Sequence, residues 1–270
     1  MQNGDAWRQT RRGSVKPTAR PYRTLGRTGR AVSAIGFGGS TIGIPDYVDA
    51  GDPDSAAFRQ EALAAIQAAL AEGINYFDTA PAYGDGRSER LYGEALEVHR
   101  EKVFIATKIA PVNDAGPGYY DEQLGQSLAR LKTDQVDLLQ VHGAAWTDEA
   151  ADDLLDSCLP AWLARVRAEG RCRHVGITAE NTSGALERLL RSGRFEVLQI
   201  AYSLIYQGAR HLATGPGQRA LSGYRRATLP LRPLSLQGAQ PCWISAASSS
   251  GASGVDPISC SLSASKGPVA

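Results

Sequence analysis

The sequence predicts an α/β protein, a (β/α)8 barrel of the TIM type in which about six βα units are recognisable. Between residues 35 and 203, short apolar runs alternate with helical segments of about ten residues or more, which is typical of a parallel sheet with crossover helices. A doubly wound sheet would share this rhythm, but no G-x-G-x-x-G turn follows the first strand and no acidic residue occupies the ribose position. The length of 270 residues suits one barrel, whose usual size is about 250 residues.

The N-terminal part precedes the repeating units. Residues 1–21 are polar and basic and have no periodic apolar face, so we expect a disordered extension. Residues 22–33 contain two half-apolar runs around a Gly-rich turn, which predicts a β-hairpin at one end of the domain. Residues 34–39 predict a strand whose glycines, Gly38 among them, let another group approach the backbone closely. The loop 40–54 is long enough to wall a pocket.

The repeating units are helical segments that each lead into a short apolar run. The predicted helices cover residues 56–72, 88–96, 121–131, 150–169 and 183–190. The strands that follow them cover residues 74–78, 103–108, 136–142, 174–178 and 197–202. With the strand at 34–39 these make six strands, and residues 22–206 are expected to form the barrel portion of the chain.

Residues 207–270 differ in composition from everything before them. They contain eleven serines, six prolines and a single acidic residue, Asp256, and only residues 242–245 form a strand-like run. We expect an atypical, poorly ordered tail on a truncated barrel, and we hypothesise that it is translated from a shifted reading frame. Translating the gene in its other frames tests this, because the hypothesis requires the missing strands in one of them. A six-stranded sheet would leave two edges exposed, which favours aggregation.

Charge and composition exclude several classes of protein. No run approaches the roughly 18 apolar residues that a membrane helix needs. The net charge is +1, yet residues 1–30 carry eight Lys or Arg against Asp5 alone, while residues 31–206 carry 15 basic and 26 acidic residues. The basic ends lack the aromatic or Cys/His spacing of a nucleic-acid-binding module, so neither a nucleic-acid nor a membrane partner is expected.

The cysteines and the N-terminus bear on location. The four cysteines have neither zinc-site spacing nor the density of a disulfide scaffold, so we expect no metal and a reducing, cytoplasmic location. The pair Arg11-Arg12 is not followed by an apolar core, so no secretory signal is expected. An Arg-rich organelle presequence is the open alternative.

Four polar side chains lie at or just after the ends of three consecutive predicted strands: Asp78, Tyr83, Lys108 and His142. Singly, each could be a turn residue, a pocket wall or a solvated polar group, but in a barrel these strand ends converge on one mouth. A tyrosine with an ordinary pKa near 10 is a poor acid at pH 7 unless a cation such as Lys108 favours its phenolate. Asp78 would hold Lys108, and His142 would bind a substrate oxygen or share in proton transfer. The set suits protonation of an alkoxide as it forms from a carbonyl, or the reverse.

The chain resembles the aldo-keto reductase family in several motifs. These are residues 22–29 (YRTLGRTG), 36–39 (GFGG), 73–84 (GINYFDTAPAYG) with Ser88-Glu89, 106–108 (ATK), 137–142 (DLLQVH) and 176–178 (GIT). The resemblance covers residues 22–206 and implies a (β/α)8 barrel with NADP(H) as cofactor, NAD being possible. It also implies that Asp78, Tyr83, Lys108 and His142 are the catalytic residues, with Tyr83 as general acid and base.

The resemblance implies cofactor contacts as well. Gln199 matches a glutamine on the sixth strand, Thr178 takes one position of a Ser-Asn pair, and Gly38 lies on the first strand. The asparagine of that pair has no clean match, since Ala179-Glu180-Asn181 follows. In this family the cofactor phosphate is held after strands seven and eight, for which residues 207–270 offer no counterpart, so we expect weak cofactor binding.

Two functions from different classes follow. The first is an oxidoreductase that transfers a hydride between NADP(H) and an aldehyde, ketone or sugar carbonyl or alcohol. The second is a catalytically impaired barrel remnant, or a binding or regulatory protein that lacks the cofactor phosphate site. Nucleic-acid binding by the basic ends would rest on charge alone. The identity of the substrate, the direction of reaction and the oligomeric state stay open at the level of sequence.

Overall fold

The computed structural model describes residues 22–25, 28–44, 52–202 and 207–209, together with two strands at Trp243–Ala246 and Ser259–Leu262. The predicted N-terminal extension and most of the segment 207–270 lie outside the described residues, as does part of the loop 40–54.

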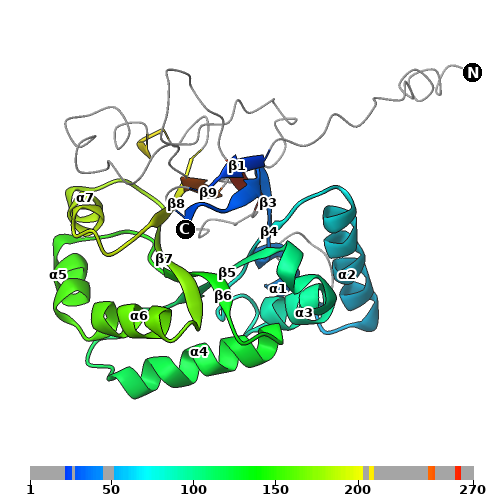
Figure 1. Cartoon of the computed structure of the whole chain (residues 1–270), viewed down its shortest axis with the longest axis horizontal. Helices are drawn as coiled ribbons and strands as arrows, with labels where there is room; N and C mark the ends of the chain where they lie inside the picture. The colour runs from blue at the N-terminus through cyan, green and yellow to red at the C-terminus, as the bar shows by residue number, and fades with distance from the viewer. Residues whose placement is uncertain are drawn as a thin grey trace, which may run out of the picture.

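Eight strands close into one barrel in the order β10-β3-β4-β5-β6-β7-β8-β9 (Figure 1). The strands of the repeating units are β3 (Ile35–Gly38), β4 (Tyr76–Asp78), β5 (Phe104–Ile109), β6 (Val136–Val141), β7 (Cys172–Ala179) and β8 (Val197–Ala201). Each of these six strands pairs in parallel with the next one. The predicted α/β barrel with six recognisable units is therefore confirmed.

The remaining two strands close the barrel in a different way. β9 (Trp243–Ala246) pairs with β8 in the antiparallel sense, and β10 (Ser259–Leu262) pairs antiparallel with β9 and parallel with β3. Both edges of the six-stranded sheet are therefore paired, contrary to the expectation that they would be exposed. β9 overlaps the strand-like run at residues 242–245.

Helices cover the outside of the barrel (Figure 1). They are α2 (Ala56–Ala71), α3 (Arg87–Leu96), α4 (Pro117–Leu131), α5 (Asp148–Asp156), α6 (Leu159–Ala168) and α7 (Gly184–Arg191), with the short α1 (Ser40–Gly43) and the 3-10 helix η2 (Glu97–Lys102). The ends of the predicted helices and strands differ from these by a few residues. α4 begins earlier than predicted because Pro117 at its first position needs no hydrogen-bond acceptor for a backbone N–H.

One predicted helix is wrong. The segment 150–169 forms two helices, α5 and α6, separated at Ser157 and Cys158. Ser157 has an extended backbone, with φ −70° and ψ 172°. Pro160 lies in the first turn of α6, where its missing N–H is tolerated, but in the middle of a longer helix its ring would clash with the preceding turn. The proline therefore requires the break that periodicity alone did not indicate.

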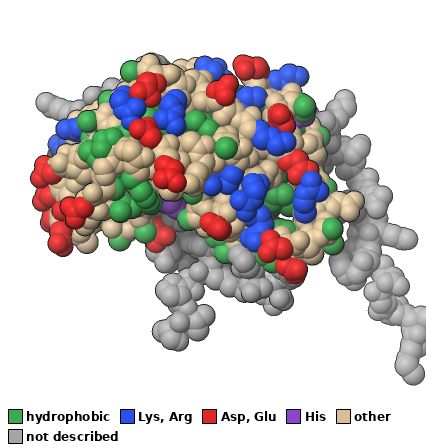
Figure 2. Space-filling model, turned by 90° about the horizontal axis from the view of Figure 1, so that it is seen from below, with side chains coloured by type: hydrophobic (Ala, Val, Ile, Leu, Met, Phe, Trp, Pro, Cys, Tyr) green, Lys and Arg blue, Asp and Glu red, His purple; other side chains and the backbone are tan. Residues whose placement is uncertain are grey.

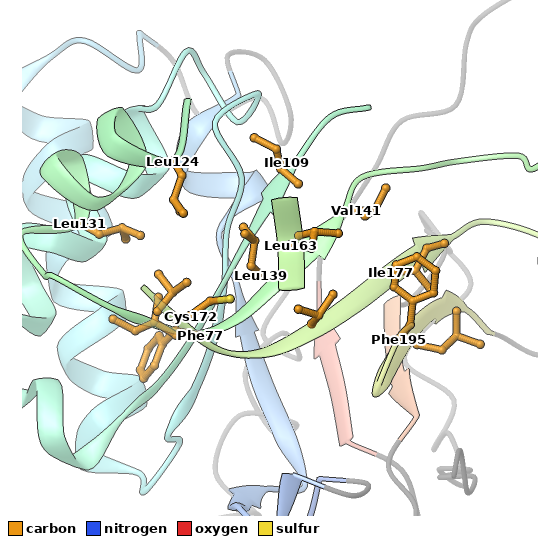
Figure 3. Close-up of a cluster of buried hydrophobic side chains, with 14 of the residues drawn as sticks. Phe77, Ile109, Leu124, Leu131, Leu139, Val141, Leu163, Cys172, Ile177 and Phe195 are labelled. Atoms are coloured by element: carbon orange, nitrogen blue, oxygen red, sulfur yellow. The ribbon is translucent and has the colours of Figure 1, made fainter. Parts of the chain in front are cut away.

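Strand residues alternate between the helical layer and the inside of the barrel. Phe77, Leu139 and Ile177 belong to the core between strands and helices, as do the helix residues Leu124 and Leu163 (Figure 3). Their neighbours along the strands face the other way. Inside the barrel, a second cluster at the N-terminal end of the strands contains Leu25, Val32, Tyr76, Phe104, Ala106, Leu138 and Val197.

The predicted hairpin closes this N-terminal end. β1 (Tyr22–Thr24) and β2 (Ala31–Ser33) pair in the antiparallel sense. The Asn75 side chain accepts a hydrogen bond of 2.6 Å from the Ser33 N–H and donates one of 3.1 Å to the Ala31 carbonyl. With the N-terminal end filled by apolar side chains, the inward positions left for polar chemistry lie towards the C-terminal ends of the strands.

Acidic and basic side chains are intermixed on the face shown in Figure 2. Among the described residues, exposed ion pairs include Arg165 with Asp121 at 2.7 Å and Arg188 with Asp148 at 3.0 Å. Within the described part of the chain, no helix combines the length and the apolar character needed to cross a membrane.

Candidate active site

Two inward positions on β4 and β5 place a buried ion pair near the C-terminal end of the barrel. Asp78 is the last residue of β4, and Lys108 is the fifth residue of β5. Both side chains are 2% exposed, and Lys108 Nζ lies 2.7 Å from Asp78 Oδ2. Nζ also donates a hydrogen bond of 2.8 Å to the Thr79 carbonyl. Two acceptors therefore fix the ammonium group where the strands end.

The charge of Lys108 follows from opposing effects. Burial lowers the pKa of its ammonium group, whereas Asp78 and Tyr83 raise it through charge and hydrogen bonding. The balance leaves the pKa of Lys108 above its usual value. Lys108 is therefore a cation at neutral pH, although it is buried.

The turn between β4 and α3 positions Tyr83. The Tyr83 N–H donates to the Ala80 carbonyl at 3.1 Å, and the Tyr83 carbonyl accepts from the Ser88 N–H at 3.2 Å. Gly84 has a φ of +65°, and a Cβ atom there would collide with the carbonyl of Gly43 in α1. Glycine is therefore required next to the tyrosine, because the turn packs directly against α1.

The Tyr83 ring meets both Lys108 and His142. Lys108 Nζ lies 4.7 Å from the centre of the ring. The Tyr83 and His142 ring centres are 6.1 Å apart, and their planes are nearly perpendicular at 86°. The structure thus brings Asp78, Tyr83, Lys108 and His142 to one place at the C-terminal end of the barrel.

His142 follows β6 directly, and its N–H donates a hydrogen bond of 2.8 Å to the Ile109 carbonyl. Burial and the nearby charge of Lys108 lower the pKa of His142 to about 3. The imidazole is therefore neutral at pH 7. A neutral imidazole donates one hydrogen bond and accepts another, so it suits the binding of a carbonyl or hydroxyl oxygen.

Thr178 holds the backbone after His142. Its hydroxyl donates a hydrogen bond of 2.7 Å to the Gly143 carbonyl and accepts one of 2.9 Å from the Gly143 N–H. The Trp146 indole packs against Gly143, where any Cβ would collide with it, and donates to the Thr178 carbonyl at 2.9 Å. The hydroxyl that was predicted to contact the cofactor is thus engaged with this loop.

The other predicted cofactor contacts lie on neighbouring strands. Gly38 ends β3 beside Asp78, and the Gly39 N–H donates to the Asp78 carbonyl at 2.7 Å. Gln199 points into the barrel from β8 and is 1% exposed. Asn181 is exposed and lies two residues beyond the end of β7.

Gln140 is a polar residue of the site that was not among the predicted ones. It is fully buried on β6, and its Nε2 donates hydrogen bonds to Asp78 Oδ1 at 3.2 Å and to Gln199 Oε1 at 2.9 Å. A signal for it existed in the sequence: Gln140 precedes His142 by two residues, so strand periodicity puts both on the same face.

A second layer ties α3 to the strand ends. The Thr79 hydroxyl donates to Ser88 Oγ at 2.8 Å, and the Thr107 hydroxyl donates to Glu89 Oε1 at 2.6 Å. Glu89 is 0% exposed and pairs with Arg130 at 2.7 Å. The Ser88-Glu89 motif of α3 is thus hydrogen-bonded to Thr79, just after β4, and to Thr107 of β5, and so fixes these strand ends to the helix.

Known proteins resemble this chain in sequence and in fold. The model of the aldo/keto reductase family matches residues 34–214. The chain is 35% identical over 162 residues to L-galactose dehydrogenase of Arabidopsis thaliana, a match that covers 58% of this chain and 47% of that enzyme. The chain therefore spans about half the length of this relative.

Two solved structures share the fold. A Pseudomonas aeruginosa protein assigned to the aldo-keto reductases superimposes with a TM-score of 0.63 and 29% identity, covering 78% of each chain. An aldo/keto reductase from Klebsiella pneumoniae, solved in complex with NADP and acetate, has a TM-score of 0.55 and 24% identity and covers 73% of this chain and 63% of its own.

Proposed function

The chain belongs to the aldo/keto reductase family, and from this premise we propose that it is an oxidoreductase that uses NADP(H). Its proposed substrates are aldehydes, ketones, or the carbonyl and alcohol forms of sugars. The observation that carries the proposal is the buried Lys108–Asp78 pair beneath Tyr83, with a neutral His142 beside it.

The proposed proton path runs through this chain's own side chains. Bound NADPH would supply the hydride that reduces the carbonyl carbon. Tyr83 gives its phenolic proton to the carbonyl oxygen, and the Lys108 ammonium stabilises the phenolate that is left. Asp78 keeps Lys108 charged and in place. His142, being neutral, donates a hydrogen bond that orients the carbonyl oxygen. The reverse sequence oxidises an alcohol, with Tyr83 accepting the proton.

The residues present fit the nicotinamide end of such a cofactor. Gln199 and Gln140 offer amide groups next to Asp78, and within the described residues Gln140 Oε1 is a buried acceptor without a hydrogen-bond partner. An amide N–H₂ such as that of nicotinamide would satisfy an acceptor of this kind. The neighbour that contains NADP shares the barrel fold, and the relative named for L-galactose oxidation supports a sugar as one substrate class.

A second function is favoured by one observation. β9 runs antiparallel to β8, whereas a complete (β/α)8 barrel has a parallel strand at that position. Barrels of this type commonly hold phosphate after strands seven and eight. A chain that lacks this geometry would keep the catalytic side chains and bind the cofactor weakly, as a barrel remnant or a binding protein.

One experiment separates the two functions. Purified protein is titrated with NADPH while the fluorescence of the nucleotide is followed, and the consumption of NADPH is then measured with a panel of aldehydes and aldoses. Saturable binding with turnover that is lost in Tyr83→Phe supports the oxidoreductase. Folded protein that shows no binding at millimolar NADPH contradicts it and favours the remnant.

A further inference from the structure

Gln140 fixes the carboxylate that holds Lys108. Asp78 Oδ2 accepts from Lys108 Nζ at 2.7 Å and, in a longer contact of 3.5 Å, from Gln199 Nε2, whereas Asp78 Oδ1 accepts from Gln140 Nε2 at 3.2 Å. Gln140 is therefore the donor to Oδ1, while Lys108 and Gln199 bind Oδ2, and the three donors come from three strands. A carboxylate that is bound at both oxygens cannot rotate about its Cβ–Cγ bond without losing one of them.

The orientation of the Gln140 amide follows from its partners. An ionised carboxylate only accepts hydrogen bonds, so the amide atom next to Asp78 must be the nitrogen. That nitrogen also donates to Gln199 Oε1 at 2.9 Å. Gln140 Oε1 is left buried and, among the described residues, without a partner. This carbonyl contributes no hydrogen bond to the described part of the protein without cofactor, so the group of Gln140 that acts on Asp78 and Gln199 is its donor.

The neighbouring strand leaves room for this side chain. β7 lies between β6 and β8, and Gly176 of β7 is paired with Gln140. A Cβ atom on Gly176 would lie 3.2 Å from Gln140 Cγ and 2.9 Å from the Val197 carbonyl. The absence of a side chain at Gly176 therefore lets Gln140 extend past β7 to reach Gln199.

We propose that Gln140 is a positioning residue, whose single amide nitrogen holds the Asp78 carboxylate on Lys108 and holds the Gln199 amide beside it. The proposal rests on the proposed function only in treating Asp78, Lys108 and Tyr83 as the proton-transfer group. Without this donor, Asp78 Oδ1 and Gln199 Oε1 each lose a hydrogen bond, only Oδ2 of the carboxylate stays bound, and we expect the carboxylate to rotate away from Lys108. Lys108 then loses the negative charge that offsets its burial, and its proton becomes easier to remove.

The test follows the proton on Lys108 directly. The chain has only five lysines, so lysine labelled with ¹³C at Cε gives few signals, and Lys108→Met identifies the signal of Lys108. The signal is titrated with pH in the wild type and in Gln140→Met, which keeps the length of the side chain and removes the donor. The matched control is Leu139→Val, the adjacent buried residue that faces the helices.

We expect the proton affinity of Lys108 to fall about tenfold in Gln140→Met, which corresponds to about one pKa unit, and to stay unchanged in Leu139→Val. An unchanged titration in folded Gln140→Met overturns the proposal, even if the variant melts earlier than the wild type. If Gln140→Met does not fold, Gln140→Asn replaces it, because its shorter amide cannot reach both partners. The same downward change is expected there, and its absence overturns the proposal.

This titration needs neither cofactor nor substrate. If the chain fails to bind NADPH, the proposed function is lost while the positioning role of Gln140 is still decided by the lysine signal. If NADPH binds and is consumed in a reaction that Tyr83→Phe abolishes, but Lys108 titrates alike in wild type and Gln140→Met, the proposed function is supported and the positioning role of Gln140 is contradicted.

Discussion

Asp78 and Asp137 are buried carboxylates at opposite ends of the same barrel. Asp78 is the last residue of β4, whereas Asp137 is the second residue of β6. They are 2% and 1% exposed, and each has a cation nearby: Lys108 lies 2.7 Å from Asp78, and Arg100 lies 2.9 Å from Asp137. Burial and ion pairing alone therefore do not distinguish the two.

Their partners do. Asp137 accepts from the Ile105 N–H at 3.0 Å and is paired with Arg100 and Arg173, and arginine does not release its proton in proteins. This arrangement holds strands together and has no proton to transfer. Asp78 holds a lysine that can titrate, and a tyrosine lies over that lysine. The comparison teaches that a buried carboxylate marks a site of chemistry when its partners can exchange protons and lie at the mouth of the barrel.

The largest expected effect comes from removing the cation at the mouth. Lys108→Met leaves Asp78 buried without its charge partner and leaves Tyr83 without the cation that stabilises its phenolate. We expect kcat to fall by about 10²–10⁴-fold, the usual contribution of general acid–base catalysis. The measurement is NADPH consumption at 340 nm with an aldehyde substrate. If the activity of Lys108→Met stays within a few fold of the wild type, the Asp78–Lys108 pair has no catalytic role, and Asp78 is then a structural carboxylate like Asp137.

Removing Arg100, the cation that pairs with Asp137 at the N-terminal end of the barrel, should lower stability without changing catalysis. Arg100→Met deprives Asp137 of its nearest charge and leaves the Ile105 N–H and the longer contact of 3.4 Å with Arg173. We expect a loss of about 3 kcal/mol in the free energy of unfolding, as for other broken buried pairs. Urea unfolding measures this loss, and kcat per folded molecule should not change. A large fall in kcat would show that the N-terminal end also takes part in catalysis.

The low pKa of His142 predicts how stability responds to acid. Burial and Lys108 lower the pKa of His142 to about 3 in the folded state, while in the unfolded chain it is about 6.5. As pH falls from about 6.5 towards 3, His142 becomes protonated in the unfolded state but stays neutral in the folded state. This histidine therefore lowers the free energy of unfolding in that pH range. His142→Gln should therefore lose less stability than the wild type between pH 7 and pH 4.

The control for this prediction lies at higher pH. Between pH 7 and pH 8 the histidine is mostly neutral in both states, so the difference in unfolding free energy between wild type and His142→Gln should hardly change. Parallel stability curves across the whole acid range would mean that the pKa of His142 is the same in the folded and unfolded states and would contradict its lowering by burial and Lys108.

The smallest effect is expected at an exposed pair. Lys132 lies 3.0 Å from Glu97, but their side chains are 51% and 54% exposed. Exposed pairs contribute about 0–1 kcal/mol because water and salt screen them. Lys132→Gln should change the free energy of unfolding by less than about 1 kcal/mol, and the change should shrink further in 1 M salt. A loss as large as that of Arg100→Met would contradict the ranking of the pairs by burial.

The fold could be predicted from the sequence wherever the hydrophobic periodicity of a segment and the residues that end it indicate the same helix or strand. The strand ends that carry Asp78 and Lys108 were visible because a short apolar run ends abruptly in a charged residue. The division between α5 and α6 was missed because the apolar period continues across Ser157 and only Pro160 requires the break. The closure by β9 and β10 depends on pairing between distant segments, and local sequence reports little about such pairing.

The candidate site was predictable in part for the same reason. His142 stood out as the polar residue at the end of an apolar strand. Gln140 did not stand out, because a polar residue in the middle of a strand is as easily solvent-exposed as buried, and only the closed barrel makes its face the interior. The hydroxyl of Thr178 was assigned by its position in a motif, while its hydrogen bonds to Gly143 depend on the spacing of two strands.

The central claim is that Tyr83, supported by Lys108 and Asp78, transfers the proton during carbonyl reduction. The most direct measurement compares NADPH-dependent reduction of one aldehyde by wild type, Tyr83→Phe and Arg100→Met at equal concentrations of folded protein. The account predicts turnover by the wild type and by Arg100→Met, and a loss of about 10²-fold or more in Tyr83→Phe. Equal rates in wild type and Tyr83→Phe, or no turnover by folded wild type that binds NADPH, would contradict it.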